Sequence, residues 1–541
     1  MPGRRVRAGR GSYTTGHRFS DVPPPRIQRS MLNRSHSVTT AFDTGLIIPI
    51  LRDELLPGDS FRLRPTIFAR AKTLLHPIMD NVYLDFHVFA VPLRLIWSNS
   101  EEFFGAEPGG PGTRVDRQTP KLDCTSAIAA EELHDYLGYV PGFSDATSAR
   151  WPNNLYARAY NLIWNEYYRH AELDDLVPLD LDDGPDDQAD YVLLRRRKRH
   201  DYFTSCNPWP NKGAEVTVPL GTSAPITGTI AGNGVPTFVG PGMSTGDALE
   251  VNTTGANTNV DFDMVGGSGP GDLSWSDPNL DASGLSADLS NAVSPTINDL
   301  RYAFAQQHLF EQFARGGSAR YTELIRSVFG VVSPDARLQR PELLGAMSQL
   351  LSVNPVASAS RTVGALGDLG AYGVTAQTGR SVIYSSTEHQ VLLGLISVRT
   401  DLKYFQGHHR DLLRDTRFDY YYPAFANIGE QAVESREIFT DGTASDLDVF
   451  GYIGRFDEYR HKPSVVTGKM RSGVAGDVDY WHLGEEFATR PTLNSTFMEE
   501  DQPFARVIIV NSEPEFFLDA WMDYRHARPM PAFAVPGLRR L

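Results

Sequence analysis

Apolar and polar side chains alternate along residues 82–92 (VYLDFHVFAVP), and this period of two is the feature that most restricts the fold. In an extended chain, successive side chains point to opposite faces, so the apolar positions gather on one side of a strand. Pro92 ends the pattern because proline cannot donate to a sheet ladder. We predict a strand over 82–92 that is buried mainly on one face.

Similar patterns occur near both ends of the chain. A strand is predicted to begin at residues 61–64, after the turn at 56–59 (LPGD). Residues 506–510 (RVIIV) and 515–524 (EFFLDAWMDY) are predicted to be two strands joined by a turn. The elements between these β-rich ends have a different period.

Three segments in the middle of the chain have helical spacing. Residues 155–169, 300–315 and 321–329 carry apolar side chains three and four residues apart, and Ser318 is placed to cap the third. Stripes of this kind are typical of core helices. Strands at both ends with helical and irregular excursions between them favour a mainly β barrel or sandwich with long insertions.

The segment 221–295 differs from the rest of the chain. Its 75 residues include thirteen glycines and eight acidic residues, but no Lys or Arg. Short apolar groups such as 237–239 allow scattered β-structure without the periodicity of a core element. We interpret the segment as a projecting surface loop, since long insertions in folded chains are usually functional or disordered.

Positive charge is concentrated at the N-terminus, although the chain as a whole carries −15. Residues 1–36 contain eight arginines and one aspartate, a net of +7. The arginines are Arg4, Arg5, Arg7, Arg10, Arg18, Arg26, Arg29 and Arg34. An arm of this composition suits contacts with nucleic-acid phosphates; the alternatives are a solvated tail and an arm that packs on a neighbouring subunit.

A second change of charge lies in the middle of the chain. Residues 171–190 hold nine acidic residues and no Lys or Arg. A basic run follows at once, consisting of Arg195, Arg196, Arg197, Lys198 and Arg199. This pattern is interpreted either as an acidic loop followed by a basic strand or turn, or as a patch for nucleic acid or another subunit.

No arrangement of residues indicates catalysis, a metal site or a cofactor. Cys124 and Cys206 are the two cysteines, and the aromatic and proline neighbours of Cys206 favour a buried structural thiol. His408, His409 and His461 lack metal-ligand spacing. We therefore predict a structural or binding role and no enzymatic one.

The sequence also predicts no membrane insertion. The longest apolar run, 391–398 (VLLGLISV), is much shorter than the roughly 20 residues that span a bilayer. The charged N-terminus is followed by no apolar segment of the kind found in secretory signals.

Long blocks of the sequence resemble the major capsid protein of microviruses, specifically the gokushovirus branch of these small single-stranded DNA bacteriophages. The blocks are residues 34–36, 42–97, 158–169 (RAYNLIWNEYYR), 198–213 (KRHDYFTSCNPWPNKG), 314–345 and 528–538 (RPMPAFAVPGL). They are spread over most of the chain outside 221–295.

The resemblance implies an eight-stranded antiparallel viral jelly roll with long helical and irregular insertions between its strands. It also implies a T=1 icosahedral shell of sixty copies, held by five-fold, three-fold and two-fold contacts around circular single-stranded DNA. Expected partners are the virus's minor or pilot and scaffolding proteins and a receptor on the bacterial host surface. The protein would be assembled in the host cytoplasm and reside in the virion.

The resulting domain organisation is a basic arm (1–36) and one jelly-roll domain (37–541). The insertion 221–295 would form a surface protrusion at the three-fold axes and serve in host attachment. Loops 98–150 and 346–390 are expected to provide subunit contacts. The alternatives are a jelly-roll carbohydrate-binding protein, which would need exposed aromatic platforms, and a nucleic-acid-packaging protein, which would not explain the acidic bulk.

Overall fold

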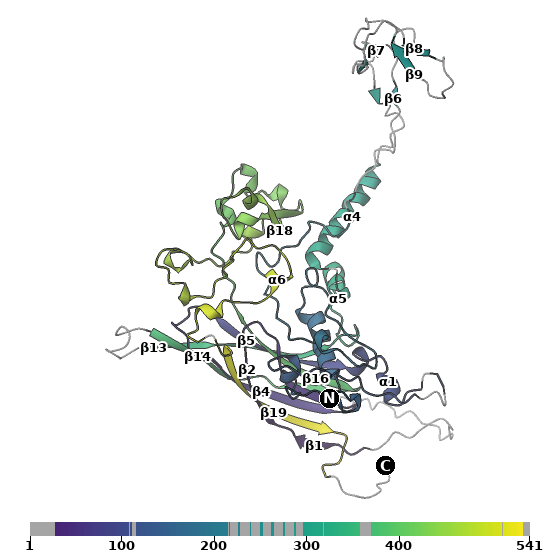
Figure 1. Cartoon of the computed structure of the whole chain (residues 1–541), viewed down its shortest axis with the longest axis vertical. Helices are drawn as coiled ribbons and strands as arrows, with labels where there is room; N and C mark the ends of the chain where they lie inside the picture. The colour runs from purple at the N-terminus through teal and green to yellow at the C-terminus, as the bar shows by residue number, and fades with distance from the viewer. Residues whose placement is uncertain are drawn as a thin grey trace, which may run out of the picture. The chain divides into compact units, whose positions relative to one another are not determined.

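The computed structural model describes residues 27–107, 109–110, 115–214, 216, 296–317, 319–357, 369–510 and 512–533, together with six short strands between 226 and 287. Residues 1–210 with 313–541 form one compact unit, and residues 211–312 form a second. Among the described residues of the first unit, most regular structure is antiparallel β-sheet (Figure 1).

The larger sheet has seven strands in the described part of the chain, with the core order β1-β19-β4-β14-β13. β2 pairs with β19 beside β1, and β15 pairs with β4 beside β14. The strands are β1 (Ser30–Asn33), β2 (His36–Phe42), β4 (Ser60–Ala71), β13 (Ser352–Ala357), β14 (Leu369–Thr378), β15 (Val382–Ser385) and β19 (Phe516–Arg528).

The smaller sheet has four described strands in the order β12-β5-β16-β3. These are β3 (Ile48–Leu55), β5 (Val82–Pro92), β12 (Glu342–Leu350) and β16 (Gln390–Thr400). A separate hairpin pairs β17 (Glu430–Glu434) with β18 (Val449–Gly454).

The main core lies between the two sheets. One apolar cluster joins β4 and β19 of the seven-stranded sheet, through residues such as Leu63 and Ala520, to β5 and β16 of the four-stranded sheet, through residues such as Phe86 and Ile396. Two antiparallel sheets that bury their inner faces against each other form a two-layer β architecture. The predicted fold class is thus confirmed as mainly β with antiparallel sheets.

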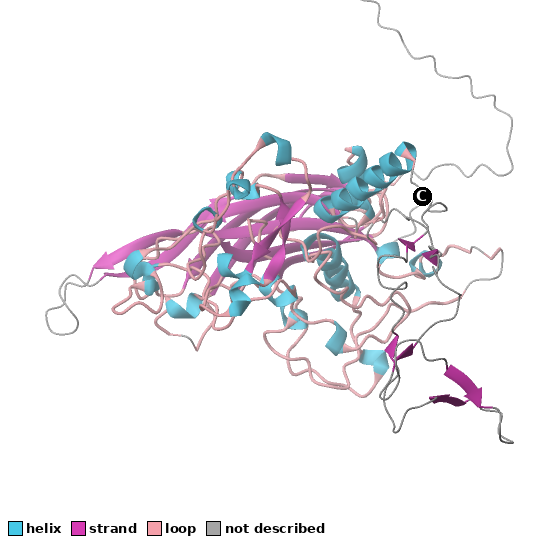
Figure 2. Cartoon of the chain, turned by 90° about the horizontal axis from the view of Figure 1, so that it is seen from above, coloured by secondary structure: helices cyan, strands magenta, loops and turns pink. Residues whose placement is uncertain are grey.

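The four-stranded sheet is buried on its other face as well, so the prediction of one-sided burial for β5 was wrong. Phe89 and Val91 of β5 pack in a second apolar cluster with α3 (Leu155–Ile163). Figure 2 shows helices and irregular segments lying over the strands on this side. A strand covered on both faces is apolar at nearly every position, and β5 has that composition.

The described helices are α1 (Ser100–Phe103), α2 (Leu133–Tyr136), α3 (Leu155–Ile163), α4 (Ile297–Gly316), α5 (Tyr321–Leu324) and α6 (Ser495–Met498). π turns extend α3 over Trp164–Tyr168 and α5 over Ile325–Phe329. None of the helices in the described part of the chain is long and apolar enough to cross a membrane.

The three helical predictions were right in position but differ in burial. α3 is buried around almost its whole circumference, whereas Ala314 is the only buried residue of α4 among those described. α5 and its π turn contain no buried residue, and Arg320 rather than Ser318, which lies outside the described residues, occupies the cap position. The apolar stripes of α4 and α5 are therefore not core in the isolated chain.

Two further predictions were wrong. Residues 506–510 are not a strand: Arg506 ends a 3₁₀ turn (Phe504–Arg506), and Ile508 forms an isolated bridge with Leu74. Val507 and Ile508 pack into the inter-sheet core without a ladder partner along their length. The predicted loop 346–390 contains strands β13, β14 and β15 and most of β12.

The second unit contains the predicted insertion 221–295. Its described strands pair antiparallel as β6 (Ile226–Thr227) with β11 (Ser286–Ala287), β7 (Phe238–Val239) with β10 (Ser274–Trp275), and β8 (Leu249–Asn252) with β9 (Asp261–Met264). The expectation of scattered β-structure is thus met at these positions.

Candidate functional site

The basic run 195–199 is held between two distant segments of the first unit. Arg195 forms a β-bridge with Leu46, and Arg197 forms one with Glu499. The Arg196 N–H donates to the Gly45 carbonyl oxygen at 2.7 Å. The main chain of the run is therefore fixed from both sides.

Arg196 belongs to a buried charge cluster. Its guanidinium donates to Asp85 Oδ2 at 2.6 Å, and Arg399 donates to the same oxygen at 2.8 Å. Burial raises the pKa of Asp85, but Arg196, a hydrogen bond from Ser348 and Arg399 together outweigh that effect and lower the pKa below its ordinary value. Burial, together with the nearby Arg196, lowers the pKa of His87 to about 4, so this imidazole is neutral at pH 7.

The next two cations of the run are also paired. Arg197 contacts Asp174 at 2.7 Å and Glu499 at 3.0 Å. Lys198 Nζ lies 2.9 Å from Glu485 Oε2 and is buried. Arg196, Arg197 and Lys198 thus hold separate segments of the unit together through ion pairs.

The remaining predicted nucleic-acid residues fall into two groups. Arg195 is partly exposed and pairs with Asp501 at 2.9 Å, while Arg199 is exposed. Arg4, Arg5, Arg7, Arg10 and Arg18 lie outside the described residues. Nucleic-acid contact by the run and by the arm stays a prediction, and the structure adds an internal role for the three middle residues of the run.

Glu500 lies beside this cluster and supplies a test of its electrostatics. Burial raises the pKa of Glu500 to about 7, even though Thr400 N–H donates to it and Arg196 and Lys198 favour its charge; Glu485 opposes that charge. The folded state holds this proton more tightly than the unfolded state, so the free energy of unfolding falls as pH rises from about 4.5 to about 7.

We expect Glu500→Gln to be more stable than the parent protein at pH 8, by on the order of 2 kcal/mol, and nearly equal to it at pH 4.5. The amide keeps an acceptor for Thr400 and removes the cost of ionisation. Thermal denaturation at both pH values measures the difference, with the exposed Glu132→Gln as control. A Glu500→Gln variant that is less stable than the parent at pH 8 would contradict this account.

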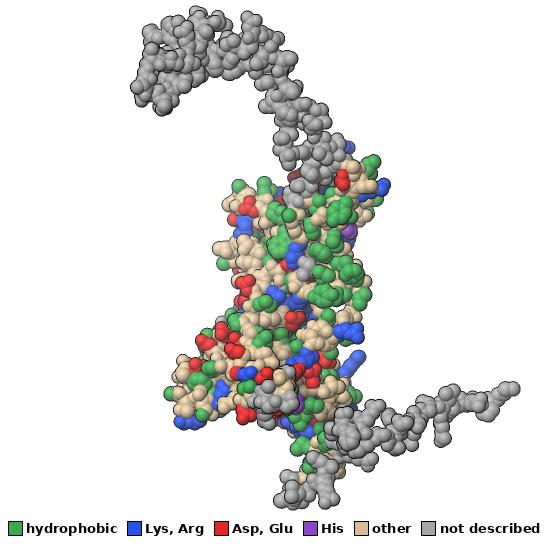
Figure 3. Space-filling model, turned by 90° about the vertical axis from the view of Figure 1, so that its right-hand side faces the viewer, with side chains coloured by type: hydrophobic (Ala, Val, Ile, Leu, Met, Phe, Trp, Pro, Cys, Tyr) green, Lys and Arg blue, Asp and Glu red, His purple; other side chains and the backbone are tan. Residues whose placement is uncertain are grey.

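Large hydrophobic side chains are exposed on the first unit away from the sheets. Tyr321, Phe329 and Val332 are 69%, 71% and 78% exposed. Hydrophobic side chains at the level of α5 are visible in Figure 3. A second exposed group, made of Phe418, Tyr420, Tyr421 and Tyr422, lies in the loop before β17. Groups of exposed hydrophobic side chains are typical of protein–protein contact sites.

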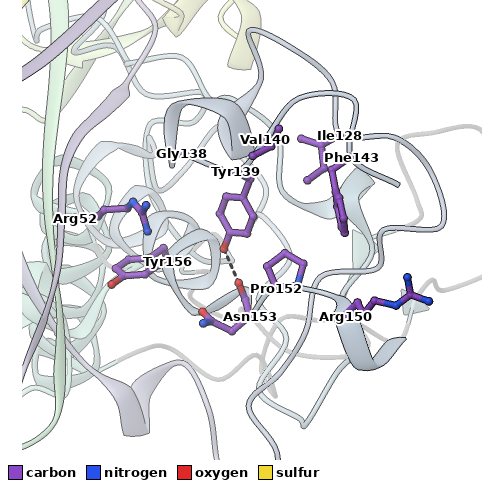
Figure 4. Close-up of a pocket in the computed structure, with 10 residues that line it drawn as sticks. All are labelled: Arg52, Ile128, Gly138, Tyr139, Val140, Phe143, Arg150, Pro152, Asn153 and Tyr156. Atoms are coloured by element: carbon purple, nitrogen blue, oxygen red, sulfur yellow. Dashed lines mark hydrogen bonds between the residues drawn. The ribbon is translucent and has the colours of Figure 1, made fainter. Parts of the chain in front are cut away.

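A cavity of about 330 Å³ lies beside β3 (Figure 4). Arg52 stacks on Tyr156, with its guanidinium carbon 5.6 Å from the ring centroid, and Tyr139 donates to the Asn153 carbonyl oxygen at 2.5 Å. None of the described residues that line it is a carboxylate or a histidine. Its walls therefore offer aromatic and cationic contacts.

Sequence reasoning missed the outer face of the seven-stranded sheet. Phe68 on β4 and Phe517 and Trp521 on β19 are exposed there, on the same face as Arg62, Arg70 and Arg525. The alternation of apolar and polar residues in both strands was the available signal, since it leaves every second side chain on the face away from the core.

Comparison with known proteins identifies the family of this chain. A family model described as capsid protein (F protein) matches residues 20–538. The chain belongs to this capsid protein family. The capsid protein VP1 of Bdellovibrio phage phiMH2K is 39% identical over 97% of this chain and 98% of its own length.

Two further relatives of this capsid family member have the same coverage. The capsid protein VP1 of Chlamydia phage 1 is 37% identical, and that of Spiroplasma virus 4 is 34% identical, each over 97% of this chain and 98% of its own length. The resemblance to gokushovirus capsid proteins is confirmed. The chain is a structural protein, and a capsid protein resides in the virion.

Proposed function

We propose that sixty copies of this chain form a T=1 icosahedral shell around a circular single-stranded DNA genome. The observation that carries the proposal is the alignment of 97% of the chain with viral capsid proteins over 98% of their length. A match of this extent takes in exposed as well as buried residues, which supports a shared mode of assembly.

The pairing of the strands supports an eight-stranded viral jelly roll as the shell-forming domain. In chain order, β2, β3, β4 and β5 alternate between the two sheets, β12 stays in the four-stranded sheet with β5, and β14, β16 and β19 alternate again. This distribution is the one expected of a jelly roll. One sheet then reads β2-β19-β4-β14 and the other β12-β5-β16-β3. β1, β13 and β15 extend the first of these sheets.

The exposed apolar groups on α5 and before β17 support the same function. A closed icosahedral shell requires each subunit to present different surfaces at its five-fold, three-fold and two-fold contacts. Side chains such as Phe329 and Tyr421, which are exposed in the single chain, would be buried at such contacts.

The basic arm and the insertion would provide contacts with DNA and with the host. The arm 1–36 has a net charge of +7 and would contact genomic DNA inside the shell. The insertion 221–295, which lacks Lys and Arg, would project at the three-fold axes and contact a receptor on the host surface. Scaffolding and minor or pilot proteins of the virus would take part in assembly in the host cytoplasm.

Expression of three chains tests this function. The full chain, a chain without residues 1–18 and a chain without 225–292 are each produced with the viral scaffolding protein and genome, and then compared by electron microscopy and sedimentation. We expect shells from all three, reduced DNA content without 1–18, and reduced binding to host cells without 225–292. A full chain that remains monomeric under these conditions would overturn the capsid proposal.

A further inference from the structure

The outer face of the seven-stranded sheet combines exposed aromatic rings with arginines. Phe68, Phe517 and Trp521 are 46%, 42% and 50% exposed. The register places Asp519 opposite Phe68, so Phe517 and Trp521 are the diagonal neighbours of Phe68 on the adjacent strand. Diagonal neighbours on one face of a sheet lie close enough for large side chains to form a continuous surface.

Arginines border this aromatic surface at both ends. Arg70 lies opposite Phe517, and its guanidinium carbon is 5.9 Å from the ring centroid of Tyr372. At the other end, Arg62 on β4 lies directly opposite Arg525 on β19. Like charges in directly opposite positions destabilise a sheet, and an anion bound between them would relieve the repulsion. This pair therefore provides a favourable position for a phosphate.

The charge of the face opposes that of the chain as a whole. Arg62, Arg64, Arg70 and Arg525 outnumber Asp519 and Asp523, a balance of four to two, within a chain of net charge −15. Asp523 lies 3.6 Å from Arg525 and accepts from Ser35, and Asp519 accepts from Thr39. The carboxylates are thus partly compensated. Arg62 Nε donates to Ser381 Oγ at 3.1 Å and Arg525 is the partner of Asp523, and both arginines are exposed at the edge of the aromatic surface.

The arm enters the fold at this same sheet. Its last described residue before β1, Arg29, donates to the Gly58 carbonyl oxygen and to Ser60 Oγ at the start of β4. β1 then pairs with the end of β19 that contains Arg525. The basic arm is therefore connected to the edge of the sheet that carries the opposed arginines, whereas helices cover the four-stranded sheet on the other side of the unit (Figure 1).

We propose that the outer face of the seven-stranded sheet is a binding surface for single-stranded nucleic acid. Bases stack on Phe68, Phe517 and Trp521, and the phosphates between them contact Arg62, Arg525 and Arg70. Exposed bases stack on aromatic side chains whatever their sequence, which suits a surface that must accept an entire genome. The inference rests on the proposed capsid function and assigns this face to the interior of the shell.

The test measures binding of a fluorescein-labelled oligothymidylate to the purified full chain by fluorescence anisotropy at several salt concentrations. We expect Phe68→Ala/Trp521→Ala to weaken binding at least tenfold, because each stacked base contributes substantially to affinity. Arg62→Gln/Arg525→Gln should make the plot of log binding constant against log salt concentration less steep, by about the slope that two phosphate contacts contribute. Tyr321→Ala removes a ring of α5 that is 69% exposed, more than Phe68 or Trp521, and should bind like the parent.

Shell formation is measured separately on the same proteins by electron microscopy. Unchanged oligothymidylate affinity in both double variants would overturn the inference and leave the capsid function standing. Variants that bind normally but no longer form shells would show that the face is an interface between copies, which also overturns it. A parent chain that binds oligothymidylate through these residues yet forms no shells would support the inference and contradict the capsid proposal. Should Phe68→Ala/Trp521→Ala fail to fold, the arginine pair still decides the question, since those side chains are not buried.

Discussion

Replacing Gly45 with alanine is expected to prevent the protein from folding. Gly45 is buried and has φ of +78°, and a Cβ atom built on it would lie 1.8 Å from the carbonyl oxygen of Glu500. No rotamer change relieves the overlap, because both atoms are fixed to main chain. The main chain of residue 500 is itself tied to the basic run, since Glu500 N–H donates to the Arg196 carbonyl oxygen at 2.9 Å.

The expected loss of stability exceeds about 4 kcal/mol, which places it among the most destabilising single substitutions. Gly442→Ala is the matched control. Its φ is +76°, almost the same as that of Gly45, but nothing lies within 4 Å of the position of its Cβ. The control variant should therefore lose only the stability that an alanine at positive φ costs, about 1–2 kcal/mol.

Soluble yield and the midpoint of urea unfolding distinguish the two variants. We expect Gly442→Ala to be soluble with a slightly lower midpoint, and Gly45→Ala to be insoluble. If the two variants unfolded at the same urea concentration, the close approach of the Gly45 turn to residue 500 would be wrong.

Replacing Arg158 with methionine is expected to cost about 3–5 kcal/mol of stability. The Arg158 side chain is completely buried in α3, and the Asp186 side chain is 1% exposed. Arg158 Nε donates to Asp186 Oδ2 at 2.7 Å, and Nη2 donates to Oδ1 at 2.5 Å. Methionine fills a similar volume but leaves the carboxylate without its cation, and burying an uncompensated charge is costly.

The Arg158 guanidinium also satisfies main-chain groups, which adds to the expected loss. Nη1 donates to the carbonyl oxygens of Ile96 and Asp182 at 3.1 and 2.9 Å. Asp186 still accepts from Asn154 at 2.8 Å in the variant, but this neutral donor cannot replace the charge.

Arg460→Met makes the same substitution in an exposed ion pair. Arg460 pairs with Asp457, and the Arg460 side chain is 52% exposed, so we expect a loss below about 1 kcal/mol. The double variant Arg158→Met/Asp186→Asn removes both charges and should recover part of the loss. Chemical denaturation of the four proteins gives the comparison; an equal effect of Arg158→Met and Arg460→Met would show that the buried pair does not stabilise the fold.

The strands in which apolar and polar residues alternate could be predicted from the sequence, because the alternation indicates burial of one face. β19 was found because its residues alternate, and the start of β4 was found for the same reason. The apolar segment 506–510 has the composition of a strand but no partner strand along its length, and no local pattern reports that absence. β5 was placed correctly, but the layer of α3 that covers its second face depends on residues about 70 positions away.

The candidate surfaces were harder to predict because their partners are distant in sequence. The basic run was recognised, but its carboxylate partners include Asp85 and Glu485, which lie 111 and 287 residues away. The apolar stripes of α4 and α5 were interpreted as core because sequence periodicity shows that a face is apolar and not which molecule covers it. In a shell-forming protein, such a face is available for contact with another copy.

The position of β19 within its sheet also determines the order in which the chain can fold during translation. β19 lies between β4 on one side and β1 with β2 on the other, and its residue Asp519 follows Thr39 of β2 by 480 positions. A nascent chain that has not yet reached β19 has the edges of β2 and β4 unpaired and cannot complete the layer that closes the core. β19 therefore has to emerge from the ribosome before the subunit can fold. Chains that stop before β19 cannot fold and so cannot join a growing shell.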